Sequence, residues 1–117
     1  MPLKTYTGER YQDAWIVNVR TGETGSWQIL DPKPSQKINN HSPDGFSWGY
    51  GGSGPAQLAL AILLDMYGEE LARKLYQDFK WDVIANFPQD GSWCLEHWQI
   101  EAWIGGEKIV EGKAGVH

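Results

Sequence analysis

Residues 42–64 read SPDGFSWGYGGSGPAQLALAILL, and this stretch decides the fold. Between residues 56 and 67 only Gln57 and Asp65 are polar. A surface helix would carry polar residues along a whole face, so this composition predicts a helix that is apolar nearly all round and buried at the centre of the domain. Gly68 provides the stop, because glycine is common just past the end of a helix.

The start of this helix is marked by Gly54 and Pro55. Proline is favoured at the first helical position, where its missing N–H would have no partner in any case. Ser53 or Gly54 is expected to cap the helix, and Gln57 stands where its side chain would reach back toward that cap.

The residues before the helix alternate between aromatic rings and small side chains. Residues 43–45, Pro-Asp-Gly, predict a turn, since proline sets one dihedral angle and glycine accepts a positive φ. If the next residues are extended, three rings project from one face, and a glycine-rich run of backbone amides leads into the positive end of the helix dipole. Stacking rings beside free amides suit a nucleotide. The predicted ligand-binding residues are Phe46, Trp48 and Tyr50 for stacking, Gly51, Gly52, Ser53 and Gly54 for phosphate, and Arg10, His41 or Lys80 for positive charge.

The same alternation also has a purely structural interpretation. Glycines occur next to aromatic residues where a strand lies tightly over a helix, and the rings then belong to the core. This interpretation is favoured for Phe46 and Trp48, whereas Tyr50 carries a hydroxyl that needs a polar partner. The glycine-rich run lacks the lysine of a Walker motif, and Ser53 does not fit the GxSxG pattern of a nucleophile elbow.

The segment before this stretch predicts a small antiparallel sheet. Residues 5–7, 14–19 and 26–30 are rich in β-branched and aromatic side chains, and a Thr-Gly-Glu-Thr-Gly turn separates the second strand from the third. Residues 31–41 carry two prolines and few apolar side chains, so they are expected to form a loop.

The segment after it predicts two further helices. Residues 69–79 place Leu71, Leu75, Tyr76 and Phe79 at helical spacing, whereas residues 80–87 are compatible with either a longer helix or a short strand. Residues 95–104 predict a last helix with Ile100, Trp103 and Ile104 inside and Gly105-Gly106 as its stop, and residues 107–117 a frayed tail. The expected fold class is α+β, with about three strands packed against about three helices.

Composition narrows the range of functions. The chain has 117 residues, the size of a single domain over residues 1–117, and a net charge of −5, which argues against general nucleic-acid binding. Its single cysteine, Cys94, cannot form an internal disulfide. No apolar run has the length of a signal peptide or a membrane span, so a cytoplasmic location without a membrane partner is expected.

No catalytic or metal-binding group stands out. Cys94 and His97 have the spacing of half a zinc site, but a structural zinc needs four ligands, and only His41 and His117 remain as further histidines. No metal or other cofactor is therefore expected. A nucleophilic pair of Cys94 and His97 would also need the two side chains within hydrogen-bond reach and a third group that orients the histidine.

The central stretch also carries a family resemblance. Residues 45–60 follow the pattern GFxWGYxGSGPAQLAL, which resembles the signature of domain of unknown function family 6166, a family of short prokaryotic, plasmid and phage domains. Further pieces that fit are Tyr6-x-Gly8-x-Arg10, Phe79-Lys80, Trp93, Ile100 and Trp103-Ile104. The resemblance implies no chemistry, but it implies a small intracellular protein that is often found on mobile elements.

These observations lead to three functional hypotheses. The first is a non-enzymatic binding protein that captures a small anionic, nucleotide-like ligand, with sequestration of a host immune signal as one use. The second is a module that inhibits a host protein through its acidic surface or an exposed aromatic patch. The third is a small hydrolase that uses Ser53 or Cys94. Assembly into a homo-oligomer is left open.

Overall fold

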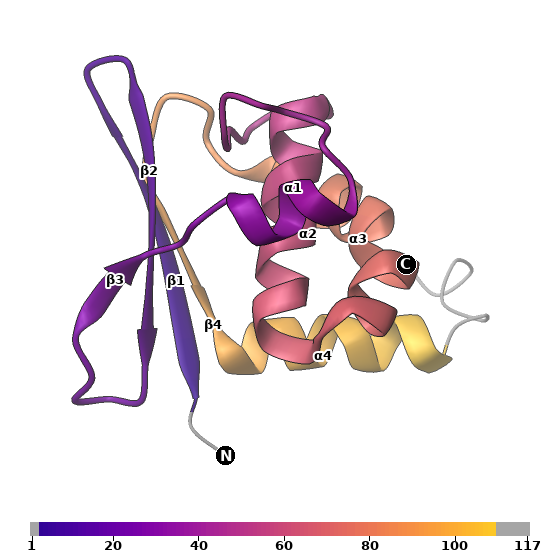
Figure 1. Cartoon of the computed structure of the whole chain (residues 1–117). Coiled ribbons are helices and arrows are strands. Elements are labelled where there is room, and N and C mark those ends of the chain that lie inside the picture. The colour runs from indigo at the N-terminus through magenta and orange to yellow at the C-terminus, as the bar shows by residue number, and fades with distance from the viewer. Residues whose placement is uncertain (1–2, 110–117) are drawn as a thin grey trace.

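A computed structural model describes residues 3–109, and its fold is α+β, as the sequence predicts (Figure 1). One layer is a four-stranded antiparallel sheet with the strand order β3-β2-β1-β4, and the other consists of helices. The strands are β1 (Lys4–Tyr11), β2 (Ala14–Thr21), β3 (Trp27–Ile29) and β4 (Trp93–Glu96). The helices are α1 (Lys33–Ile38), α2 (Ser53–Tyr67), α3 (Glu69–Asp82), the 3-10 turn η1 (Ile84–Asn86) and α4 (His97–Ile109).

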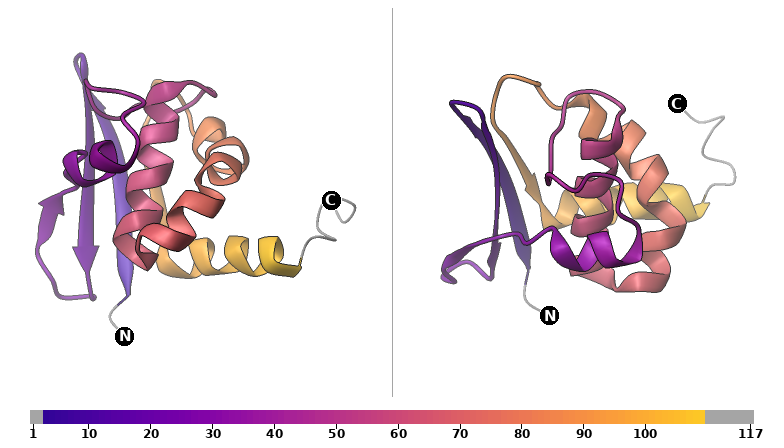
Figure 2. Two further views of the ribbon diagram at one scale, coloured as in Figure 1. Left: turned by 45° about the vertical axis from the view of Figure 1, so that its right-hand side comes forward. Right: turned by 45° about the horizontal axis from the view of Figure 1, so that its top comes forward.

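All the helices lie on one face of the sheet, and the views of Figure 2 show the other face without a covering element. The register places Tyr6, Val19 and Leu95 side by side on the helix-facing side. Thr5, which follows the opposite alternation, lies in a row with Arg20 and Glu96 on the outer side. The sheet therefore has a buried inner face and an open outer face.

Helix α2 is the buried centre, as its composition predicts. Every residue from Gly54 to Leu63 is buried. Phe79 of α3 and Ile100 of α4 are likewise fully buried in the same core. An apolar surface that covers the whole circumference of a helix needs neighbours on all sides. Helices α1 and α3 and the turn η1 contact α2, and the sheet lies on its remaining side (Figure 1).

Two predictions for the region before α2 are wrong. Residues 31–41 contain helix α1 instead of being loop throughout, and Gln57 does not reach back to the cap of α2. The Gln57 side chain is fully buried and makes four hydrogen bonds. Its Oε1 accepts the backbone N–H groups of His41 (2.8 Å) and Ser42 (2.9 Å). Its Nε2 donates to Ser35 Oγ (2.9 Å) and to the Asn39 carbonyl (3.1 Å). Contacts distant in sequence thus order α1 and the chain that follows it.

The C-terminal predictions need three changes. Helix α3 continues to Asp82, which decides the ambiguous residues 80–87 in favour of helix and a 3-10 turn. Leu95 lies in β4 instead of opening the last helix, because residues 93–96 pair with β1. Helix α4 also runs through Gly105-Gly106 to Ile109 instead of stopping there; each glycine costs a helix only about 1 kcal/mol. The part of the predicted tail beyond residue 109 lies outside the described residues.

The predicted inner faces of the helices are confirmed. Tyr76 and Phe79 of α3 are buried, and so are Ile100 and Ile104 of α4, while the Trp103 ring packs edge-on against Phe79 at 4.9 Å. Among residues 3–109, no helix combines the length and the apolar character that a membrane crossing requires.

Candidate ligand-binding site

Residues 46–50, which carry the alternating rings, do not form the extended strand that would place all three rings on one face. Gly49 has a φ of +89°, which turns the backbone between Trp48 and Tyr50. Trp48 is fully buried and Phe46 is 9% exposed, as the core interpretation predicts for both, whereas Tyr50 is 42% exposed. The hydroxyls of Tyr50 and Ser47 are hydrogen-bonded at 2.8 Å. Only one of the three rings is therefore presented to solvent.

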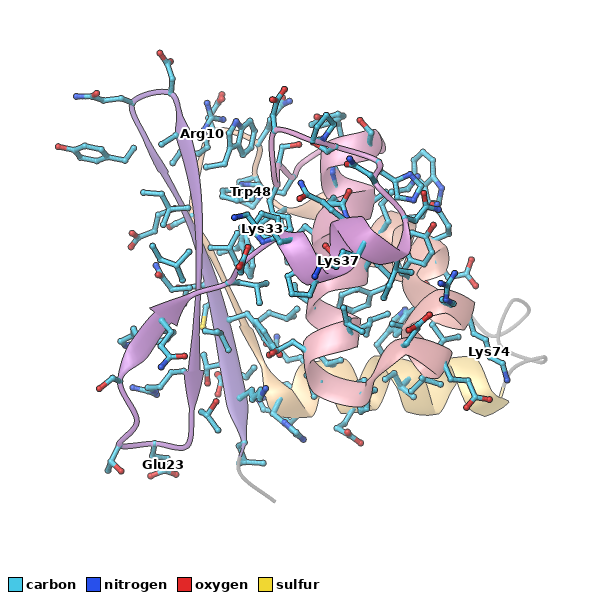
Figure 3. All side chains as sticks on the ribbon, viewed as in Figure 1. Arg10, Glu23, Lys33, Lys37, Trp48 and Lys74 are labelled. Atoms are coloured by element: carbon cyan, nitrogen blue, oxygen red, sulfur yellow. The ribbon has the colours of Figure 1, made fainter. Side chains whose placement is uncertain are left out.

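Trp48 is instead the centre of an aromatic cluster. Its ring meets Trp15 of β2 edge-on at 4.8 Å and Trp93 of β4 edge-on at 5.5 Å, and Trp93 stacks on Phe87 at 4.5 Å. The Arg10 guanidinium lies 3.6 Å above the Trp15 ring. Figure 3 shows Trp48 between the sheet and the helices, with Arg10 near the same end of the sheet. Arg10 and Trp93, two of the residues that carry the family resemblance, thus join the core around Trp48.

The glycines of the motif allow close packing. A side chain at Gly49 would lie 2.5 Å from the Gln89 backbone, and one at Gly54 would collide with Ser47. A side chain at Gly51 would enter the ring of Trp81. These glycines therefore let the segment between residues 46 and 54 pack against α3 and the loop before β4.

The start of α2 remains open to a ligand. Gly52 occupies the cap position, one residue before the predicted Ser53 or Gly54, and no side chain makes a capping hydrogen bond there. The first turn contains no acidic residue, and Ser53 is exposed. Unpaired amides and the helix dipole make such a terminus attractive to a negative charge.

Lys80 brings a positive charge to this helix start. Only 8% of the residue is exposed, and its Nζ donates a long hydrogen bond of 3.5 Å to the Gly51 carbonyl. The same Nζ lies 4.3 Å from the centre of the Trp81 ring. Within the described part of the chain, Lys80 forms no salt bridge. A buried ammonium without a carboxylate partner is rare, since buried charges are normally paired.

Trp81 adjoins this helix start, and the sequence analysis did not single it out. It is 58% exposed, and it lies against Gly51 and beneath the ammonium of Lys80. The Tyr50 ring lies beside Gly52. The sequence does place Trp81 directly after Lys80, but both lie in the segment whose secondary structure was ambiguous. Because α3 extends to Asp82, the two residues belong to its last turn.

Two predicted contributors lie elsewhere. The Arg10 Nη1 donates to the Gln89 carbonyl (2.9 Å), and its guanidinium lies over Trp15. His41 is hydrogen-bonded through Nε2 to the Tyr76 hydroxyl (2.7 Å). The structure thus brings together Tyr50, Gly51, Gly52, Ser53, Gly54 and Lys80, adds Trp81, and leaves Phe46, Trp48, Arg10 and His41 outside the exposed site.

The His97 ring, the candidate partner of Cys94, contacts Lys4 and Glu101. His97 accepts the Lys4 N–H at its Nδ1 (3.4 Å), and its Nε2 lies 3.7 Å from Glu101. Neither ring nitrogen has a hydrogen bond to Ser53 or Cys94 in residues 3–109. That part of the chain also contains no group of three His, Cys, Asp or Glu side chains that could hold a metal ion.

Comparison with known proteins identifies the family of the chain. No curated protein and no solved structure matches the chain. One family model matches residues 6–106, a range that includes the aromatic cluster, the glycine-rich start of α2 and the Lys80-Trp81 pair. The chain therefore belongs to the family of unknown function DUF6166.

Proposed function

We propose that the protein binds, without transforming it, a small anionic ligand that carries a planar ring, such as a nucleotide. The observation that carries the proposal is the buried ammonium of Lys80, which has no carboxylate partner and stands beside the uncapped start of α2. An anion at this place would pair with the ammonium and accept hydrogen bonds from free amides. The ammonium and the free amides both attract a negative charge.

The surrounding rings suit the uncharged part of such a ligand. Tyr50 and Trp81 are 42% and 58% exposed, and both adjoin the backbone of Gly51-Gly52. Stacking of a base on an aromatic side chain contributes about 1–3 kcal/mol. A base stacked on either ring could direct its phosphate toward Ser53 at the start of α2.

We further propose that this binding removes a nucleotide signal of a host defence system in the bacterial cytoplasm. The family resemblance to phage and plasmid domains supports this use, since such elements benefit from silencing host immunity. The ligand proposal does not depend on it.

Binding can be tested with calorimetry and thermal shifts on linear and cyclic nucleotides, using the parent nucleosides as uncharged controls. Nucleotides are expected to bind and to raise the melting temperature, whereas nucleosides should bind at least about tenfold more weakly, because charged hydrogen bonds contribute about 1.5–3 kcal/mol. No response to any nucleotide of a broad panel would refute the proposal.

Ser53→Asp separates binding from folding. A carboxylate at the helix start stabilises the helix by about 0.3–1 kcal/mol but repels an anionic ligand. The variant is therefore expected to melt higher and bind nucleotides at least about tenfold more weakly. Equal affinity in a more stable variant would contradict the location of the site.

Two matched pairs test the other contacts. Lys80→Met keeps the buried stem but removes the charge, and Lys74→Met does the same at an exposed position of α3. Trp81→Ala removes a site ring, and Trp98→Ala removes a ring of similar exposure (65%) on α4. Only the first member of each pair should weaken nucleotide binding.

A second candidate function rests on the open outer face of the sheet. Tyr11, Trp27 and Ile29 are 68%, 45% and 74% exposed there. With a net charge of −5, the partner that we propose for this face is a basic protein whose activity is inhibited. Capture of such a protein should be lost with Ile29→Asp and retained with Ser53→Asp; the opposite pattern would exclude this face.

A further inference from the structure

A small cavity lies far from the start of α2, on the outer face of the sheet. It has a volume of about 170 Å³, and its walls are the β2–β3 connection on one side and the junction of β4 with α4 on the other. Figure 3 shows Glu23, at the tip of that connection, at the end of the sheet opposite to Arg10. Pockets for drug-sized ligands measure roughly 300–1,000 Å³, so this cavity suits a smaller molecule.

Arg20 contributes an unpaired positive charge to this cavity. Its Nε is shut off from solvent and has no hydrogen-bond partner. In residues 3–109, the guanidinium makes no salt bridge and is held over the Trp27 ring at 4.8 Å. An anionic ligand in the cavity would pair with the terminal nitrogens of this guanidinium, since the closed-off Nε cannot be reached. The ring contact also orients the side chain before binding.

Negative charge stands across the same cavity. The register places Arg20, Thr5 and Glu96 in one row over three neighbouring strands, so the small Thr5 side chain separates the two charges. Glu23 lines the cavity as well. Neither glutamate forms a salt bridge within the described residues. Lys4 and His97 also line the cavity, but the Lys4 ammonium is paired with Asp65 and the His97 ring lies 3.7 Å from Glu101. Two carboxylates beside the remaining cation, Arg20, disfavour a multiply charged anion such as phosphate and favour a ligand that carries both signs.

The remaining wall is apolar. Leu3 and Trp98 line the cavity and are 55% and 65% exposed. We propose that the cavity binds a free α-amino acid with an apolar side chain. Its carboxylate pairs with Arg20, its ammonium pairs with Glu96, and its side chain packs on Trp98 and Leu3. This site is separate from the site at α2 and does not depend on the function proposed there.

The probes are L-leucine, L-methionine and L-phenylalanine, measured with the full chain by calorimetry. At least one is expected to bind with a dissociation constant below about 1 mM. N-acetyl-L-leucine and L-leucinamide, which each lack one of the two charges, should bind at least about tenfold more weakly than L-leucine. The proposal is overturned if none of the three amino acids binds at about 10 mM, or if either capped form binds as well as L-leucine.

Variants locate the binding. Arg20→Gln and Glu96→Gln should each weaken amino-acid binding at least about tenfold, since each removes one charged partner. Glu9→Gln is the matched control, because Glu9 lies on the same face of β1 but outside the cavity. If Arg20→Gln does not fold, Glu96→Gln decides alone. Unchanged affinity in Glu96→Gln would place any amino-acid binding elsewhere, and nucleotide binding should be unaffected by all three variants.

Discussion

At the scale of single residues, the central motif is mainly a device for close packing. Gly49 combines a φ of +89° with an approach to the Gln89 backbone that leaves no room for a methyl group. Trp48 then fits between two strands and the helices, with its Nε1 donating to the Gly91 carbonyl at 3.3 Å. The one ring of this segment that is exposed, Tyr50, belongs to the proposed ligand site.

Gly49→Ala is expected to destabilise the fold more than Gly22→Ala. Both glycines have positive φ, +89° and +80°, so both variants lose about 1–2 kcal/mol from backbone strain. Only Gly49 also meets a neighbour, whereas nothing lies within 4 Å of a side chain at Gly22. The collision should add about 1–3 kcal/mol. Urea unfolding measures the difference, and equal losses would contradict the packing role.

At the scale of elements, buried polar contacts attach α1 to α2. Gln57 accepts two backbone N–H groups of the connection between these helices and donates to Ser35 within α1 and to Asn39 at its C-terminal cap. The Ser35 hydroxyl, also fully buried, donates in turn to the Pro32 carbonyl at 2.7 Å. The six-residue α1 is too short to be stable alone, so its position depends on these bonds.

Replacing Gln57 with leucine should therefore release this region. The amides of His41 and Ser42 would lose their acceptor, which costs about 1–3 kcal/mol for each buried group. We expect a loss of about 2–5 kcal/mol in unfolding free energy and faster hydrogen exchange at both amides. Gln77→Leu, at an exposed position of α3, should change stability by less than about 0.5 kcal/mol. A fully protected His41 amide in the Gln57 variant would show that another group holds this segment.

At the scale of the whole molecule, a second polar contact joins the two layers. The fully buried Tyr6 of β1 donates its hydroxyl to Asp65 of α2 at 2.6 Å, and Lys4 forms a salt bridge with the same carboxylate at 2.9 Å. Burial raises the pKa of the Tyr6 hydroxyl far above its usual value, and the hydrogen bond to Asp65 raises it further. Burial and the hydrogen bond to Glu101 likewise raise the pKa of Tyr67.

This contact predicts alkaline unfolding. A raised pKa means that the folded state keeps a proton that the unfolded chain loses, so the stabilisation is complete below about pH 10 and falls as the pH rises above it. The buried Tyr6 should lower stability by about 1.4 kcal/mol per pH unit there. In Tyr6→Phe this hydroxyl no longer titrates, so the unfolding free energy measured between about pH 10 and 11 should fall less steeply as the pH rises. Tyr11→Phe, at a 68% exposed position, should leave it intact, and an unchanged slope in Tyr6→Phe would contradict the assignment.

The sequence by itself determined the α+β class, the buried α2, the first three strands and the inner faces of α3 and α4. Each of these is a local pattern: an apolar run, an alternation or a helical spacing that holds whatever the rest of the chain does. The glycine-rich start of α2 also pointed to a candidate site with Arg10, His41 or Lys80 as its positive charge, and of these three only Lys80 contacts the glycine-rich run, at Gly51. What only the tertiary structure decided depends on contacts between distant segments. Residues 93–96 become a strand because β1 offers an unpaired edge, α1 forms because Gln57 holds the chain that follows it, and Trp48 and Phe46 enter the core because Gly49 turns the backbone. The exposure of Trp81 and the cavity beside Arg20 arise for the same reason, since a surface exists only once the layers have packed.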